Sequence, residues 1–216
     1  NGCVTVIERS RPWRTPEHLW WLRAAASRAF GFAQTLLDLL ACAFRPFRPA
    51  GLTGKRIALL GYWDWSLRVE NGVFADRYFK ALPDELAKLG ATTLRLCWLD
   101  APGRRLAAAP GVVLLQSFLD PGDALEAAFD LKPLSAYLRR RDDPDFRAAF
   151  ITGGLDLFPL FEERLLRGFL DGGLPRCALI AKATQRACAA FKIEACVHFL
   201  ENFPHARAAF AGARAA

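Results

Sequence analysis

"RIALLGYWDWSLRVENGVFADRYF", residues 56 to 79, begins with the apolar pattern of a buried strand and continues with aromatic and charged residues. Its first residues, 56 to 61, form a strand-like run that ends at Gly61. A nucleotide-binding fold would continue with a glycine-rich phosphate loop, but this chain continues with aromatic and charged side chains. These are Tyr62, Trp63, Asp64, Trp65, Arg68, Glu70 and Asp76. We therefore predict a ligand-binding loop over residues 61 to 72 and a helix over residues 73 to 90.

The rest of the chain alternates between strand-like and helical patterns. Further strands are predicted over residues 92 to 99, 112 to 116 and 195 to 200. Helices are predicted over residues 121 to 141, 155 to 171 and 175 to 191, and from residue 204 onward. Strands that are separated by helices imply a parallel sheet. The sequence therefore predicts an α/β fold, a Rossmann-like open parallel sheet with helices on both faces. Ligands of such sheets bind beyond the carboxyl ends of the strands.

The beginning of the chain differs from the rest in charge and pattern. Residues 1 to 56 hold nine Lys and Arg against three Asp and Glu, which accounts for most of the net charge of +7. A long amphipathic helix is predicted over residues 17 to 44, with Thr15 as its N-cap. Proline-rich residues 45 to 54 are typical of a linker. We therefore predict a basic N-terminal segment, residues 1 to 54, and a Rossmann-like domain, residues 55 to 216.

The predicted helix over residues 17 to 44 is apolar around most of its circumference, so a wide face needs a partner. One candidate is protein, either this chain or an upstream domain. Another is an anionic membrane, because Trp20 and Trp21 with nearby arginines suit the lipid headgroup region. Nucleic acid fits worst, because the arginines are dispersed and no stacking or groove-reading pattern accompanies them. We expect no nucleic-acid partner and leave packing on protein and peripheral membrane contact open.

Cysteine usage and hydropathy indicate the compartment. The six cysteines have no CxxC spacing, and no histidines are placed to complete a metal site. Reduced, buried thiols of this kind are typical of cytoplasmic proteins. No uncharged apolar run reaches the roughly 18 residues of a transmembrane helix, and no signal peptide is recognisable. We therefore expect no metal site and a cytoplasmic protein, either free or peripheral at the inner face of the cytoplasmic membrane.

The predicted loop over residues 61 to 72 carries residue types that bind sugars. Tryptophan rings stack on the apolar face of a sugar ring, and charged side chains hydrogen-bond its hydroxyl groups. Candidate saccharide-binding residues are Trp63, Trp65, Arg68 and Glu70, and Asp64 is a candidate general base. The structural alternative is that the aromatic residues only cover the edge of the sheet.

Two other segments lie at predicted element ends. Gly153 and Gly154 come before a predicted helix, where exposed N–H groups can bind an anion or a sugar oxygen; a plain turn is the alternative. Glu201 and Asn202 follow the last predicted strand, where a carboxylate can act as a general base and an amide can bind a hydroxyl group. A helix cap is the alternative for Asn202.

The three histidines give no recognisable catalytic spacing. His198 lies inside a predicted strand and is interpreted as a core residue, and His205 is expected to be exposed on the first turn of a helix. No Ser–His–Asp or Cys–His arrangement is recognisable in the sequence.

Two stretches resemble bacterial surface-carbohydrate biosynthesis proteins related to GT-B glycosyltransferases. They are "KRIALLGYWDWSLRVENGVFADRYFKALPDEL", residues 55 to 86, and "HFLENFPHARAAFAGAR", residues 198 to 214. The second stretch is similar to the strand–Glu-Asn–helix element that faces the cleft between the two Rossmann-like halves of such proteins. The resemblance covers roughly residues 54 to 216. It implies that Glu201 and Asn202 face that cleft, and that the first loop, Trp63 to Glu70, lines the acceptor side.

The resemblance also implies that this chain is the N-terminal, acceptor-side half and that a donor-binding half follows residue 216. We therefore expect the acceptor-binding half of a glycosyltransferase for bacterial surface polysaccharide. A nucleotide-sugar would be the co-substrate, with no other cofactor and no metal, and the fragment alone would be inactive. A saccharide acceptor would be the partner, and Glu201 or Asp64 would accept its proton. The alternative is a non-catalytic, membrane-associated scaffold or regulatory domain in envelope carbohydrate assembly.

Overall fold

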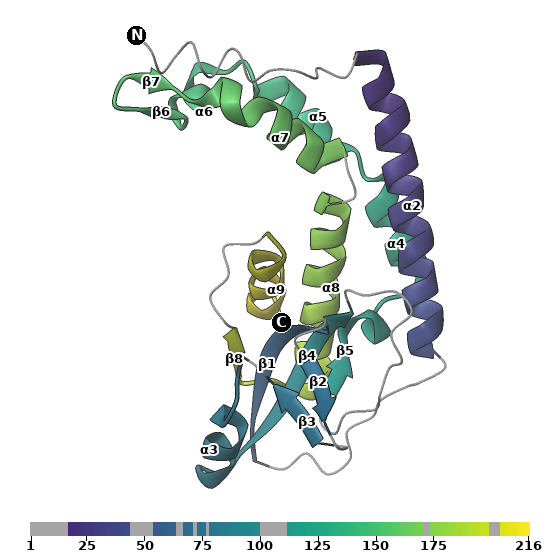
Figure 1. Ribbon diagram of the computed structural model, residues 1–216, viewed down its shortest axis with the longest axis vertical. Helices are drawn as coiled ribbons and strands as arrows, with labels where there is room; N and C mark the ends of the chain where they lie inside the picture. Colours follow the sequence, from purple (N-terminus) through teal and green to yellow (C-terminus); the bar gives the residue numbers. More distant parts are fainter. Residues whose placement is uncertain are drawn as a thin grey trace. The chain divides into compact units, whose positions relative to one another are not determined.

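The computed structural model describes residues 17–43, 54–63, 67–70, 73–76, 78–99, 112–170, 173–198 and 204–216 (Figure 1). The chain forms two compact units. Unit 1 combines Asn1–Phe30 with Lys132–Gly172, and unit 2 combines Gly31–Leu131 with Gly173–Ala216. The predicted linker over residues 45 to 54 lies outside the described residues except for Gly54, so a domain boundary there stays a prediction.

Unit 2 contains a four-stranded parallel sheet. Its strands are β1, Lys55–Trp63; β4, Ala91–Leu99; β5, Val112–Leu114; and β8, Ala195–His198. They lie in the order β5-β4-β1-β8, and each neighbouring pair is parallel. Helices flank this sheet (Figure 1). The predicted α/β class with a Rossmann-like parallel sheet is confirmed.

One face of the sheet carries the main core. Leu60 of β1, Leu96 of β4 and Val113 of β5 belong to a single buried cluster on this face. The cluster is covered by α8, Gly173–Phe191, and α9, Pro204–Arg214. Successive side chains of a strand point to opposite faces, and Leu59 on the other face is also fully buried. Burial on both faces explains why β1 reads as a continuous apolar run.

Helices α8 and α9 lie side by side because one position carries no side chain (Figure 1). A Cβ atom on Gly212 of α9 would collide with the carbonyl oxygen of Ala181 in α8 and lie 2.8 Å from its carbonyl carbon. The contact continues at Gln185 of α8, which donates a side-chain hydrogen bond to the carbonyl oxygen of Ala215 over 2.9 Å. Glycine at position 212 therefore sets how closely the two helices approach.

A short turn joins α8 to β8. Lys192 adopts the left-handed conformation, with a φ of 50°. The backbone N–H of Ile193 donates to the carbonyl oxygen of Cys188 over 3.0 Å, and that of Lys192 donates to Ala189 over 3.2 Å. These two bonds are those of a Schellman motif, which satisfies carbonyl groups at a helix end. A side-chain nitrogen of Arg56 donates to the last helical carbonyl, that of Phe191, over 2.9 Å.

Unit 1 is mainly helical. Its elements are α5, Lys132–Arg140; α6, Pro144–Ala148; β6, Ile151–Thr152; β7, Leu155–Asp156; and α7, Phe158–Leu170. Phe158 is fully buried and meets the rings of Phe146 and Phe150 at centroid distances of 6.0 and 5.3 Å. Tyr137 stacks on Phe169 at 4.8 Å. Aromatic packing therefore forms much of the interior of this unit.

The predicted N-terminal helix is confirmed as α2, Glu17–Ala43. Its first half belongs to unit 1 and its second half to unit 2. In unit 1, Ala24 packs with Leu134 and Leu170, and the Arg28 guanidinium donates to the carbonyl oxygen of Phe169 over 2.7 Å. Among the described helices, none has the length and apolar character needed to cross a bilayer.

The predicted helix over residues 73 to 90 is wrong in its first half. Residues 67 to 76 form an antiparallel hairpin of β2, Leu67–Glu70, and β3, Val73–Asp76, with Glu70 paired to Val73. The helix α3 covers only Leu82–Lys88. The two residues between the strands are Asn71 and Gly72, which is a strong two-residue hairpin signal. The helical interpretation overlooked this turn and the period-two pattern on each side of it.

Other element boundaries also differ from the prediction. The third strand ends at Leu114 and continues as a 3₁₀ helix, η1, Leu115–Phe118. The helix expected over residues 121 to 141 is two helices, α4, Pro121–Phe129, and α5, which starts at Lys132 before Pro133. Proline is favoured in the first turn of a helix, so Pro133 marks a new start within the apolar pattern.

Candidate functional site at the carboxyl edge of the sheet

The strand order indicates at which edge of the sheet a ligand would bind. From β1 the chain moves outward to β4 and β5, then returns to place β8 on the other side of β1. This is the order of the first four strands of the dinucleotide-binding fold, in which the direction of winding reverses between the first and fourth strands. Ligands of such sheets bind in the crevice beyond the carboxyl ends of the strands at this reversal. Here the reversal lies between β1 and β8.

The carboxyl ends of β1 and β8 carry or directly precede several of the predicted site residues. Leu60 of β1 pairs with His198, the last residue of β8. Trp63 ends β1, three residues beyond that pair. Asp64 and Trp65 follow β1 and lie outside the described residues, as do Glu201 and Asn202, which follow β8. The structure therefore brings together the strand ends from which these residues continue.

Arg68 and Glu70 lie in a different setting from the one predicted. Both belong to β2 of the hairpin, where Arg68 pairs with Ala75 and Glu70 with Val73. The predicted open loop over residues 61 to 72 is wrong, because β1 extends to Trp63 and β2 begins at Leu67. A ligand-binding role for Arg68 and Glu70 stays a prediction.

Gly153 and Gly154 form the tip of a second hairpin. They connect β6 to β7, with Thr152 paired to Leu155, and have φ angles of 58° and 78°. Two successive left-handed residues are what a two-residue hairpin turn requires. Helix α7 begins only at Phe158, whose N–H donates to the Asp156 carboxylate over 2.9 Å. Contrary to the predicted position, the two glycines do not directly precede a helix; a ligand-binding role for them stays a prediction.

The two described histidines near the carboxyl edge have side-chain neighbours. His198 is half-buried, and its ring meets that of Phe210 at a centroid distance of 6.4 Å. His205 is half-buried rather than exposed, and its Nδ1 lies 3.6 Å from Sγ of Cys177 in α8. Burial raises the pKa of Cys177, although Arg176 partly offsets this, so the group is a neutral thiol at neutral pH. No sequence signal marks this pair, because 28 residues separate its members.

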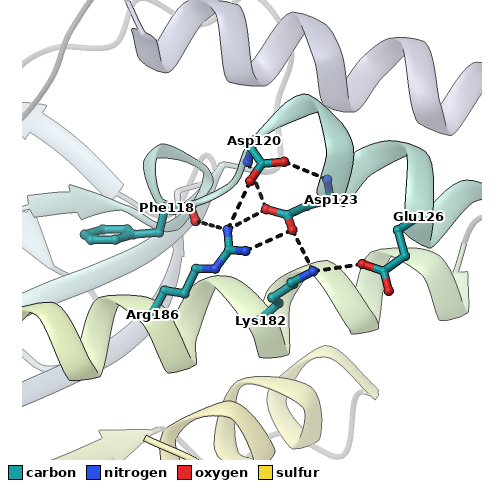
Figure 2. Close-up of polar contacts among 6 residues, drawn as sticks. All are labelled: Phe118, Asp120, Asp123, Glu126, Lys182 and Arg186. Carbon is teal, nitrogen blue, oxygen red and sulfur yellow. Dashed lines mark hydrogen bonds and ion pairs between the residues drawn. The ribbon is translucent and has the colours of Figure 1, made fainter.

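A network of charged side chains lies beyond β5, where the chain enters α4 (Figure 2). Asp120 and Asp123 form a capping box, each side chain accepting a hydrogen bond from the other's backbone N–H at 2.9 Å. From α8, Lys182 contacts Asp123 at 2.6 Å and Glu126 at 2.9 Å. Arg186 binds both carboxylate oxygens of Asp123, at 2.5 and 3.1 Å. The network joins the start of α4 to α8.

The electrostatics of this network favour structural support over proton transfer. Burial by itself would raise the pKa of Asp123, but hydrogen bonds from Lys182, from the Asp120 backbone and from Arg186 outweigh it and lower the pKa to about 2. A carboxylate with so low a pKa is a weak base at neutral pH. Arg186 also donates to the carbonyl oxygen of Phe118 over 3.0 Å. Asp123 therefore holds the segment from η1 to α4 in place beside the sheet.

The described residues offer no group of three or more His, Cys, Asp or Glu side chains that could hold a metal ion. Comparison of the chain with protein-family models, with curated proteins and with solved structures found no match. The candidate site therefore stands on the topology of the sheet and on the residues that continue from its strand ends.

Proposed function

We propose that this chain is the acceptor-binding part of a glycosyltransferase-like protein for bacterial surface polysaccharide, and that the acceptor binds beyond β1 and β8. The observation that supports this is the strand order. The reversal between β1 and β8 is the usual ligand position of such sheets, and the candidate residues continue from those two strands. The first of these segments is rich in aromatic and acidic residues, which suits a sugar better than a phosphate.

The proposed chemistry is direct transfer of a sugar. A tryptophan, Trp63 or Trp65, is the platform on which the acceptor ring stacks, and Arg68, Glu70 and Asn202 bind its hydroxyl groups. One acceptor hydroxyl attacks the anomeric carbon of a nucleotide-sugar. A new carbon–oxygen bond forms while the bond to the nucleotide phosphate breaks. Glu201 or Asp64 accepts the hydroxyl proton, and the reaction uses no metal and no cofactor besides the donor.

Saccharide binding tests this proposal directly. The purified chain is titrated with a panel of surface-polysaccharide fragments, and binding is followed by ligand NMR and tryptophan fluorescence. We expect saturable binding that weakens about tenfold, or about 1.4 kcal/mol, in the variant that removes the stacking tryptophan, Trp63→Ala or Trp65→Ala. Asp64→Ala should also weaken it.

A matched control is Phe30→Ala, because Phe30 is an exposed aromatic residue on α2, 71% accessible. This change should leave saccharide binding unaltered. Absence of binding across the panel, or equal loss in Phe30→Ala, would contradict the assignment of the acceptor site to the sheet edge. In a turnover assay with the partner domain present, Glu201→Ala should lower the rate by orders of magnitude while the fold stays intact.

A second candidate function is favoured by the surface of α2. Its exposed large apolar residues are Leu19, Leu22, Phe30, Leu37 and Leu40. A scaffold domain peripheral to a membrane would use such residues for contact with lipid or with partner proteins. Sedimentation with anionic vesicles distinguishes this function, since a membrane scaffold should bind them and should lose binding in Leu22→Glu. The scaffold would also tolerate alanine at residue 201 with little loss of activity in its assembly.

A further inference from the structure

Two cysteine sulfur atoms lie in contact where α8 meets β8. Sγ of Cys188, in the last turns of α8, is 3.8 Å from Sγ of Cys196 in β8. A disulfide bond has a sulfur–sulfur distance of about 2.05 Å, so each sulfur would move by less than about 1 Å to form one. Neither the catalytic proposal nor the charged network uses these thiols.

The backbone around this pair is held in position. The N–H of Ile193 bonds to the carbonyl oxygen of Cys188 itself over 3.0 Å, and Glu194 N–H donates to the carbonyl oxygen of Arg56 in β1 over 2.9 Å. Cys196 pairs with Ala58 of the same strand β1. The helix end and the strand start are thus fixed relative to each other, and the two sulfurs stay close whenever unit 2 is folded.

We propose that Cys188 and Cys196 form a thiol–disulfide redox site, oxidised by peroxide to an intramolecular disulfide. The Cys196 thiolate attacks one oxygen of hydrogen peroxide, the oxygen–oxygen bond breaks, and Cys196 becomes a sulfenic acid. The hydroxide that leaves takes up the proton that Cys196 had released and becomes the first water. The Cys188 sulfur then attacks the sulfenic sulfur. The sulfur–sulfur bond forms, and the hydroxyl group leaves as a second water after taking up the Cys188 proton. Two thiols and one peroxide thus become one disulfide and two waters.

The surroundings of the two thiols indicate which one attacks the peroxide and which one resolves the sulfenic acid. Cys188 is only 3% exposed, whereas Cys196 is half-buried and is the member that an oxidant can reach. The hydrogen bond between the two thiols lowers the pKa of Cys196 despite its burial. The same hydrogen bond, together with burial, raises the pKa of Cys188. The attacking and resolving roles follow, because the thiolate is the reactive form of cysteine.

Peptide mapping of the folded chain tests the proposal. The chain is treated with increasing hydrogen peroxide, free thiols are alkylated, and trypsin cuts after Arg186, Lys192 and Arg207. We expect the peptides 187–192 and 193–207 to become joined by a disulfide that dithiothreitol reverses. The bridge should form at peroxide levels that leave Cys177 open to alkylation, since Cys177 contacts His205 and forms no disulfide with another cysteine of the described residues.

Single variants separate the two roles. Cys188→Ser should let a sulfenic acid accumulate on Cys196, detected with a 1,3-diketone trap, and Cys196→Ser should give neither product. Cys177→Ser is the control and should form the bridge as the native chain does. The proposal fails if both thiols stay alkylatable while Cys177 is oxidised, if the bridge forms only after denaturation, or if Cys188 and Cys196 pair with other cysteines instead.

Discussion

Replacing Gly212 by alanine should loosen the packing of α9 on α8. The added Cβ would collide with the carbonyl oxygen of Ala181 and lie 2.8 and 3.0 Å from its carbonyl carbon and Cα. Real Cβ atoms essentially never come this close to backbone atoms. Because backbone cannot rotate away as a flexible side chain can, α9 has to shift along or away from α8. Its buried neighbours Ala206 and Ala209 would shift with it.

Two opposing terms set the size of the effect. Adding a methyl group to a tightly packed interior costs up to about 3 kcal/mol. Alanine in place of glycine within a helix stabilises the folded state by about 1 kcal/mol, because alanine has the higher helix propensity. We therefore expect the free energy of unfolding to fall by about 2 kcal/mol, which corresponds to a decrease of about 4–8 °C in Tm for a chain of this size.

Urea unfolding followed by far-ultraviolet circular dichroism measures this difference. The matched control is Gly31→Ala in α2, in the same unit, where a Cβ would meet nothing within 4 Å. That variant should be more stable than the native chain by about 1 kcal/mol. If Gly212→Ala gains stability as Gly31→Ala does, then α9 does not approach α8 as closely as the structure shows and the reasoning is refuted.

Three further predictions concern charge and backbone strain. Asp123→Asn should lower the free energy of unfolding by about 2 kcal/mol at neutral pH, because it weakens the contacts with Lys182 and Arg186; an unchanged urea midpoint would contradict this. Since the pKa of Asp123 is lowered to about 2 in the folded state, its contribution should be complete above about pH 4 and lost as the pH falls toward 2, so the native chain and Asp123→Asn should converge in acid unfolding. Lys192→Gly should raise the free energy of unfolding by about 1 kcal/mol, because the φ of 50° at this position strains any residue with a Cβ; a lower melting temperature would contradict it.

The sequence predicted the sheet well because the strands have a simple physical signature. A strand that is buried on both faces is apolar at nearly every position, and the apolar run from Ile57 to Leu60 predicted β1 on that basis. The helix α2 was also predictable, since its apolar pattern continues over 27 residues. The prediction was wrong where a strand pattern lies next to a helical pattern, as in the helix predicted over residues 73 to 90. There the Asn71-Gly72 pair outweighs the helical pattern around it.

The tertiary features could not be predicted in the same way. Asp123 and Arg186 are 63 residues apart, and Cys188 and Cys196 meet only because a Schellman turn reverses the chain between them. Lys192 takes the left-handed conformation there, where glycine is the usual residue and gives the sequence signal. Because position 192 is lysine and not glycine, the sequence gives no signal for this turn. Interactions of this kind depend on the packing of α8, which no local pattern specifies.

The strand order places the segments that follow β1 and β8 next to each other, which no single sequence motif predicts. The candidate residues after β1 and those after β8 are separated by more than 130 positions in the sequence, so their joint action was only implied by a resemblance. Because Leu60 pairs with His198 in a parallel register, both segments leave the sheet at the same edge and on neighbouring strands. Had β8 been placed beside β5, the two segments would leave the sheet three strands apart. Neighbouring parallel strands are about 4.8 Å apart, so that arrangement would separate the two segments by roughly 14 Å, too far for one sugar ring to contact both segments. The adjacency of β1 and β8 is thus the structural condition that the proposed acceptor site requires.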